Sequence, residues 1–167
     1  MATITTWTTP RDWAVDELTT EAMMDTHVRD NLKHCYEKSS LKVYTDSDTS
    51  TDTISNATVT ASSCTVSVVV DYVSDIFVWC NAGIWHSTSG DVACWLQGMR
   101  DTTGIGLKMR NDGDDTRNKN HVTSFALDES VAAGTYDYSV GFYPNGGSGD
   151  ANVDYKSITV LVIPQHG

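Results

Sequence analysis

Long apolar runs and an excess of positive charge are both missing from this sequence. Its 167 residues contain no stretch of about eighteen apolar residues, the length that a membrane-spanning helix needs. The N-terminus, MATITTWTTP, lacks the positive and apolar regions of a secretory signal. The net charge is −11, and an acidic chain repels phosphate backbones. We therefore expect no membrane insertion and no nucleic-acid partner.

Motifs that carry catalysis or bind a metal are also missing. The chain has no G-x-S-x-G, no P-loop and no H-E-x-x-H. Its four cysteines form no C-x-x-C pair, and no histidine lies at zinc-finger spacing. The run NDGDD at 111–115 has carboxylates that suit calcium but lacks the EF-hand spacing, which favours a solvated tight turn. We expect a protein that is not an enzyme and holds neither a metal nor a cofactor.

The cysteines leave two interpretations open. Without a secretory signal, reduced and buried thiols are the default. If the segments that contain Cys80 and Cys94 form a hairpin, however, these two residues face each other and can form a disulfide.

From Val59 onward, apolar residues alternate with polar ones, as in strands with one buried face. Turn-forming runs rich in glycine, asparagine and serine separate the candidate strands. We therefore expect a mainly β protein in which residues 59–167 form an antiparallel β-sandwich of the jelly-roll type. The clearest alternation is Tyr136, Tyr138, Val140 and Phe142, and the other candidate strands are 66–70, 76–80, 92–97, 105–109, 122–127 and 153–163.

A single amphipathic helix is expected over residues 19–38. A threonine hydroxyl can accept a hydrogen bond from the first turn, so Thr19 or Thr20 is the expected cap. Asp25 and Arg29 are spaced for an i,i+4 ion pair.

These elements divide the chain into three expected regions. Residues 1–38 form an extended arm followed by the helix. Residues 39–58 form a linker, with a first strand at 41–44 and a polar, exposed run at 45–58. Residues 59–167 form the β-sandwich head.

The apolar side of the helix is a narrow stripe. At about 100° per residue, Met24, Val28, Leu32 and Cys35 fall on one side. Such a stripe suits packing against a few partner helices better than burial in a large core. Asn31 falls within the stripe, where it either lies at the solvent edge or fixes the register of a small bundle.

The run PRDW at 10–13 and the run MDTHVRDNL at 24–32 resemble an N-terminal segment of small virion structural proteins of tailed bacteriophages, described as minor tail, fibre or head-associated proteins. This chain has Asp16 where that family has glycine, and Asp25 where it has asparagine. The resemblance implies a virion protein, assembled in the bacterial cytoplasm, whose N-terminal segment attaches it to a capsid, neck or tail component. The residues assigned to assembly or anchoring are Trp7, Pro10, Arg11, Trp13, Met24, His27, Val28, Arg29, Asn31 and Leu32.

Trp7 and Trp13 stand in an otherwise polar arm and need to bury a large apolar surface. They either fold back onto the chain's own helix or dock into another virion protein. Both interpretations stay open.

A second resemblance concerns the head. The segment AAGTYDY at 132–138, followed by a glycine-rich loop and a terminal apolar strand, resembles the trimeric jelly-roll heads related to tumour necrosis factor and complement C1q. Two observations together predict a homotrimer: the narrow helical stripe, which needs partner helices, and the many aromatic residues of the sandwich. Several aromatic residues either cover an inter-subunit face or fill the subunit's own core: Tyr136, Tyr138, Phe142, Tyr143 and Tyr155.

Three tryptophans bear on a further function. Trp79 and Trp95 are expected in the core. Trp85, beside His86 and a serine- and threonine-rich turn, is the best candidate for an exposed aromatic that stacks on a host glycan. The alternative to a fibre or decoration protein is therefore a carbohydrate-binding receptor module of a tail fibre. An enzyme acting on cell-wall sugars is least favoured, because no nucleophile motif is present.

Overall fold

A computed structural model of the chain describes residues 20–38, 41–55, 57–87, 93–111, 119–144 and 150–165. Within the helical segment, the side chains at 26, 27, 34 and 36–38 lie outside the description. The chain forms two compact units, residues 1–40 with 166–167, and residues 41–165.

The described part of the first unit is one helical segment. It comprises α1 (Glu21–Met24), a π-helical turn η1 (Asp25–Arg29) and α2 (Asp30–Lys38). Thr20 caps it, because its hydroxyl accepts a hydrogen bond from the Met23 N–H at 3.4 Å. The Arg29 guanidinium lies 2.8 Å from the Asp25 carboxylate. The predicted cap and the predicted ion pair are both confirmed.

One detail of the helix prediction was wrong. Residues 25–29 are π-helical, so this turn holds more residues than an α-helical turn does. The α-helical spacing of 100° per residue therefore does not continue unbroken across it.

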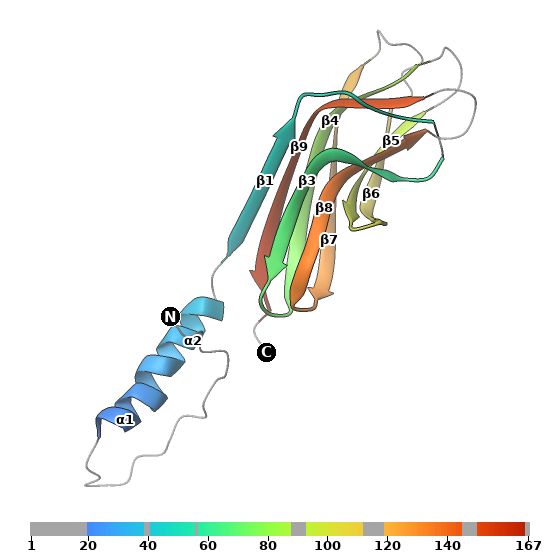
Figure 1. Ribbon diagram of the computed structural model, residues 1–167. Helices are drawn as coiled ribbons and strands as arrows, with labels where there is room; N and C mark the ends of the chain where they lie inside the picture. The colour runs from blue at the N-terminus through green and yellow to red at the C-terminus, as the bar shows by residue number, and fades with distance from the viewer. Residues whose placement is uncertain are drawn as a thin grey trace. The chain divides into compact units, whose positions relative to one another are not determined.

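In the described part of the second unit, nine antiparallel strands form two sheets packed face to face (Figure 1). Successive strands mostly cross from one sheet to the other, except between β1 and β2 and at the β5–β6 hairpin. The predicted mainly β, antiparallel sandwich of the jelly-roll type is confirmed. The five-stranded sheet has the order β1 (Lys42–Asp48), β9 (Ala151–Pro164), β4 (Ser74–His86) and β7 (Asn120–Val131), with β2 (Asp52–Ile54) also on β9; the four-stranded sheet has the order β3 (Thr60–Val70), β8 (Gly134–Pro144), β5 (Cys94–Arg100) and β6 (Thr103–Asn111).

The core lies between the two sheets and follows the expected alternation. On β8, Tyr138 is fully buried and Phe142 is 2% exposed. These two aromatics therefore fill the subunit's own core and do not cover an inter-subunit face. The physical reason is the alternation of side chains along a strand. Tyr138, Val140 and Phe142 lie two residues apart, so all three point to the same face of β8, which is the core face. Tyr136 packs against the same core, half-buried.

The polar run at 45–58 is not an exposed linker throughout. Residues 45–48 continue β1, residues 52–54 form β2, and both strands pair with β9. The prediction was wrong because it rested on composition alone, and aspartate, serine and threonine are typical of loops. In the fold, a buried cation satisfies the carboxylates of this run.

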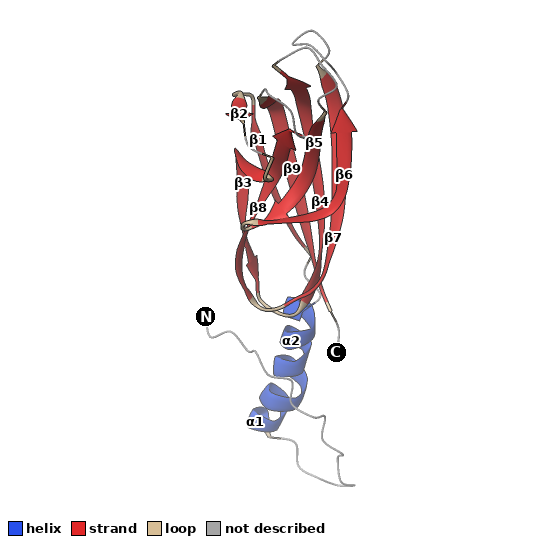
Figure 2. Cartoon of the chain, turned by 90° about the vertical axis from the view of Figure 1, so that its right-hand side faces the viewer, coloured by secondary structure: helices blue, strands red, loops and turns tan. Residues whose placement is uncertain are grey.

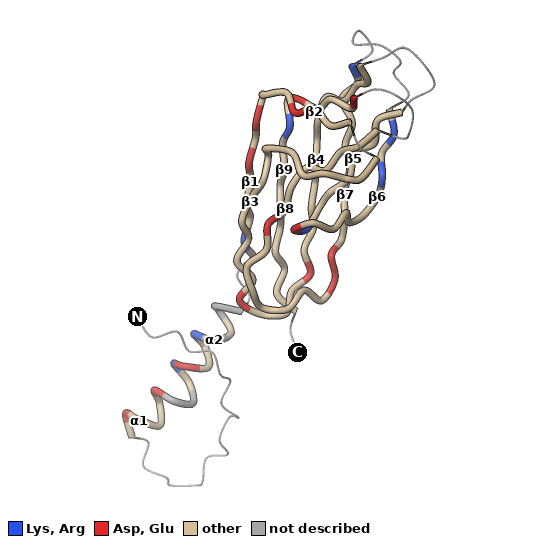
Figure 3. The backbone as a smooth tube through the Cα atoms, turned by 45° about the vertical axis from the view of Figure 1, so that its right-hand side comes forward, with Lys and Arg blue, Asp and Glu red and all other residues tan. Residues whose placement is uncertain are grey.

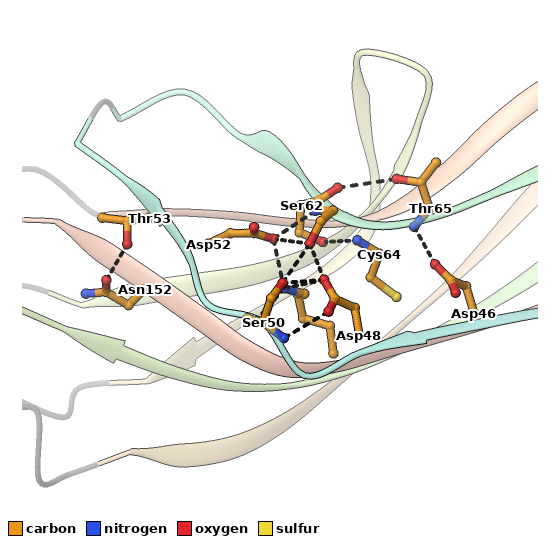
Figure 4. Close-up of polar contacts among 11 residues, drawn as sticks. Asp46, Asp48, Ser50, Asp52, Thr53, Ser62, Cys64, Thr65 and Asn152 are labelled. Carbon is orange, nitrogen blue, oxygen red and sulfur yellow. Dashed lines mark hydrogen bonds and ion pairs between the residues drawn. The ribbon is translucent and has the colours of Figure 1, made fainter.

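That cation is Lys156, whose side chain is fully buried. Its ammonium lies 3.1 Å from Asp48, 2.9 Å from Asp52 and 2.7 Å from the Ser50 carbonyl oxygen. Ser63 of β3 donates from its backbone N–H to Asp52 at 2.8 Å and from its hydroxyl to Asp48. Figure 4 shows Asp48, Ser50 and Asp52 grouped together. We call these residues the Lys156 network. It ties the β1–β2 connection to both sheets.

The edge formed by β6 depends on one glycine. Gly106 has a φ of +70°, in the left-handed region, and a Cβ there would overlap Ala126 and come within 2.7 Å of the Phe125 carbonyl oxygen. Because this glycine lets β6 approach β7 closely, the Ser124 hydroxyl reaches the Leu107 carbonyl oxygen at 2.6 Å. Figure 2 shows β6 and β7 side by side at this edge.

The hairpin proposed for Cys80 and Cys94 does not form. Cys80 lies on β4 and Cys94 on β5, which belong to different sheets. Both are buried free thiols, as is Cys64, whereas Cys35 is exposed. Burial raises the pKa of Cys80 to about 12 and that of Cys94 to about 11. These protonated core thiols agree with the reduced interpretation.

Candidate functional site

The outer face of the five-stranded sheet carries a continuous apolar group. Residues of a strand alternate between its two faces, so cross-strand neighbours in one row point the same way. Two adjacent rows run across β1, β9, β4 and β7; they are Val43, Leu161, Phe77 and Leu127, then Thr45, Thr159, Trp79 and Phe125. We call the six apolar members, Val43, Phe77, Trp79, Phe125, Leu127 and Leu161, the apolar face.

Much of the apolar face is open to solvent within one chain. Phe125 is 53% exposed, Leu127 45% and Trp79 41%, while the Phe77 and Trp79 rings stack with centroids 5.9 Å apart. Neither row contains a charged residue, although the chain carries a net charge of −11. Contiguous exposed apolar surface is typical of interaction sites, and loss of charge is typical of interface cores.

The exposure of Trp79 corrects the expectation that it lies in the core. Ile76, Val78 and Cys80 face inward on β4, so Trp79 faces outward. The apolar run 76–80 looked wholly buried because both of its faces are apolar. Sequence alone does not say which face is covered.

A second group lies further along the same outer face, beyond a polar row in which Thr123 donates a hydrogen bond to Asn81. The Lys119 ammonium sits 4.8 Å from the centroid of the Trp85 ring and 4.4 Å from that of Tyr155. It also forms an ion pair with Asp154. We call Trp85, Lys119, Asp154 and Tyr155 the aromatic–lysine cluster.

A β-bulge brings this cluster together. The pairing of β4 with β9 shifts register between Asn81 and Gly83, and Tyr155 has a φ of +43°. At Gly83 the absence of a side chain makes room, because a Cβ there would come within 2.7 Å of Asp154 and closer to Lys119. Local irregularity therefore creates the cluster.

Asp154 is unusual among the cluster's residues. Its side chain is only 9% exposed, and its Oδ2 is the oxygen that pairs with Lys119. Its Oδ1 accepts no hydrogen bond from the described residues. A buried acceptor without a donor is costly, so the cluster has unused hydrogen-bonding capacity.

Trp85 and Trp95 are both half-buried. Trp85, the predicted glycan contact, lies on β4 with Lys119 over its ring, whereas it was expected to be exposed. Trp95, expected in the core, lies on β5, where its ring stacks on Tyr143 with centroids 6.4 Å apart. Arg110 of β6 lies 5.8 Å from the Trp95 centroid, among the basic residues on that strand (Figure 3).

The carboxylates of the Lys156 network have the properties of structural ion pairs. Hydrogen bonds from the Ser50 and Ser63 hydroxyls hold the pKa of Asp48 well below its usual value. At Asp52, burial opposes ionisation, but the Ser63 N–H and the Lys156 ammonium outweigh it and lower the pKa. Both carboxylates are thus held ionised, which suits ion pairing and not proton transfer.

A second charged group spans the two sheets at their other edge. Arg100 donates two hydrogen bonds to Asp128, at 3.0 and 2.9 Å, and the Tyr138 hydroxyl donates to Asp128 at 2.9 Å. Burial, and then the nearby Asp128, raise the pKa of Tyr138. This group contains no free acid or base and joins β5, β7 and β8.

On the helix, the predicted stripe is solvent-exposed in this chain. Leu32 is 66% exposed, and Met24, Val28 and Cys35 are also exposed. Asn31 is buried, which excludes its placement at the solvent edge. The other anchor calls, Trp7, Pro10, Arg11, Trp13 and the side chain of His27, lie outside the described residues; Arg29 is described, and pairs with Asp25 and Asp30.

Nowhere in the described ranges do three or more histidine, cysteine, aspartate or glutamate side chains gather as a metal site. No helix in the described part of the chain is long and apolar enough to span a membrane.

No family model matches this chain, and no curated protein matches it. Solved structures to which this chain is similar in part include viral and bacteriophage proteins. The VP2 subviral particle of infectious bursal disease virus matches 72% of this chain at 13% identity and a TM-score of 0.43. This chain spans 32% of that protein's chain.

Two other solved structures match this chain over a larger share of their own length. Eiger TNF from S. frugiperda matches 76% of this chain and 94% of its own, at 12% identity and a TM-score of 0.44. The tripod (BppUct-A-L) from the baseplate of bacteriophage Tuc2009 matches 96% and 77%, at 12% identity and a TM-score of 0.43. At these values the likeness does not extend to function.

Proposed function

We propose that this protein is a non-enzymatic bacteriophage virion structural protein, a fibre or decoration protein that associates with copies of itself through the apolar face. The observation that carries this proposal is an uncharged apolar surface that crosses four strands and that the chain leaves exposed. Its aromatic members are of the kind that dominate binding energy when buried at an interface.

The homotrimer is the assembly we propose. Its support is the resemblance of residues 132–138 to trimeric jelly-roll heads, together with an apolar face that needs a covering partner. A second copy offers the same uncharged surface, so contact there places no acidic group against another. The remaining net negative charge would then lie on the outside of the assembly, where it keeps particles soluble.

Attachment to the virion is proposed to run through residues 1–38. The supporting observation is the exposed stripe at Met24, Val28 and Leu32, apolar side chains that this chain does not cover. Helices from other copies, or from a capsid, neck or tail protein, would bury them. Assembly would take place in the cytoplasm of the bacterial host.

The self-association test replaces Phe125 with aspartate. We expect the full chain to sediment at three times 18.2 kDa. Phe125→Asp should weaken association by about 30-fold or more, because removing an interface aromatic costs about 2 kcal/mol. Sedimentation velocity over a range of concentrations measures this.

The matched control is Val69→Asp. Val69 is 45% exposed on β3 of the other sheet, so this change adds the same charge outside the apolar face. It should leave the sedimenting mass unchanged. A wild-type chain that stays at 18.2 kDa at every concentration, or equal dissociation by both variants, would contradict the proposed interface.

The anchoring test deletes residues 1–38. We expect the remaining sandwich to keep its β-sheet circular dichroism, because its core lies within residues 41–165. It should no longer join particles in a complementation assay. As a finer probe, Leu32→Ser should reduce incorporation, whereas Lys33→Ser, one position off the stripe, should not. Normal incorporation of the deletion variant would rule out this anchor.

A further inference from the structure

Beyond assembly, we propose that the aromatic–lysine cluster binds a neutral saccharide. A sugar ring would pack its C–H face on the aromatic surface, and two neighbouring hydroxyls would bridge Lys119 and Asp154. The site lies on the outer face of the five-stranded sheet, separated from the apolar face by the polar row that contains Asn81 and Thr123.

The aromatic surface is available on Tyr155. The bulge conformation turns this residue outward, and it is 57% exposed although it lies within a paired strand. Lys119 and His121 contact it, the latter with ring centroids 6.3 Å apart. Half-buried Trp85 forms the inner wall behind Lys119. Aromatic walls with a few placed polar groups are typical of small-ligand sites.

The polar groups match a pair of hydroxyls. A hydroxyl can donate a hydrogen bond to the unpaired Oδ1 of Asp154 and accept one from the Lys119 ammonium. Few other neutral groups can both donate and accept in this way. Lys119 pairs with the other oxygen of this carboxylate, Oδ2, and its side chain is 28% exposed. A shift of that flexible side chain is what would open the carboxylate to the ligand.

Charge favours a neutral ligand. Lys119 and Asp154 neutralise each other, so the cluster offers no net positive charge to a carboxylate or sulfate. The chain as a whole is at −11, which repels sialylated and uronic sugars at a distance. Hexoses and N-acetylhexosamines without acidic groups are therefore the proposed class.

The test applies the full chain to a glycan array with neutral and acidic arms, followed by calorimetric titration of the strongest neutral glycan. We expect binding in the neutral arm. Tyr155→Ala should weaken it at least tenfold, as should Asp154→Asn. Val69→Ala, which removes an exposed apolar side chain on β3 of the other sheet, should leave the dissociation constant within twofold of wild type.

Several outcomes would overturn the proposal: no binding in the neutral arm, binding of acidic glycans alone, or equal effects of Tyr155→Ala and Val69→Ala. A readout on the wild-type chain guards against variants that misfold. Titration with a methyl glycoside of the bound sugar should shift the amide resonances of Lys119, His121 and Tyr155 and leave those of Phe125 and Leu127 in place. Shifts at the apolar face alone would contradict the assignment, whatever the oligomeric state.

Discussion

Replacing Lys156 with methionine is expected to lower the melting temperature of the sandwich by about 10 °C. The variant keeps the volume of the side chain but leaves Asp48 and Asp52 without their shared cation. Removing one partner of a buried ion pair costs about 3–5 kcal/mol. The lower end of this range applies, because the side chains of Asp48 and Asp52 are 28% and 26% exposed. A loss of about 3 kcal/mol corresponds to about 10 °C in a domain of this size. Thermal and urea unfolding followed by circular dichroism measure the loss.

The control is Lys42→Met on β1. Lys42 pairs with Asp71, but both side chains are well exposed, so solvent screens their attraction. We expect a change of at most about 1 kcal/mol. Equal losses in the two variants would mean that the burial of Lys156 adds nothing to stability.

The dependence of stability on pH tests the same network independently. Asp48 and Asp52 have lowered pKa values in the folded state, so their stabilising effect is complete above their unfolded pKa of about 3.9 and is lost as the pH falls below it. The wild type should therefore lose stability on acidification, and its advantage over Lys156→Met should narrow below about pH 4. An advantage that stays constant to pH 3 would rule out the carboxylates as its source.

Replacing Gly106 with alanine is expected to destabilise the sandwich by about 3 kcal/mol or more. A left-handed φ costs an ordinary residue about 1–3 kcal/mol, and forcing a methyl group into a filled space costs about as much again. The added Cβ would meet Ala126 and the Phe125 carbonyl oxygen, which are backbone-fixed neighbours that cannot swing aside. The closure of β6 on β7 should be lost first, which hydrogen exchange at Ser124 and Leu107 can detect.

Gly98→Ala is the matched control for this change. Gly98 is also a strand glycine, on β5, but a Cβ there would lie 3.6 Å from Ile105 and Val78, at ordinary contact distance. The substitution should change stability by less than about 1 kcal/mol. If Gly98→Ala destabilises the protein as much as Gly106→Ala does, then the left-handed φ and the close contacts of Gly106 do not explain why glycine occupies that position.

The elements that sequence reasoning found correctly are those with a strong local signal. Alternation on β8 and the apolar runs of β4 and β9 predicted strands, because a buried face imposes a period of two on the chain. Thr20 and the Asp25–Arg29 pair were predictable because capping and i,i+4 contacts involve only near neighbours.

The elements that it missed depend on partners distant in sequence. The run 45–54 forms strands because Lys156, about a hundred residues later, satisfies its carboxylates. The clustering of Lys119 and Tyr155 with Trp85 requires three strands and a bulge, and no spacing along the chain announces it. The signal that could have pointed to it was a tryptophan with a glycine two positions earlier, at 83, in an otherwise apolar strand.

By itself, the sequence determined that this chain makes an antiparallel β-sandwich preceded by a capped amphipathic helix, because periodicity and capping are read from neighbouring residues. Only the tertiary structure decided which apolar residues fill the core and which remain outside. Tyr138 and Phe142 went inward, while Trp79 and Phe125 went outward. The physical reason is that a strand with two apolar faces covers one of them with the opposite sheet, and the pairing of distant strands selects which one.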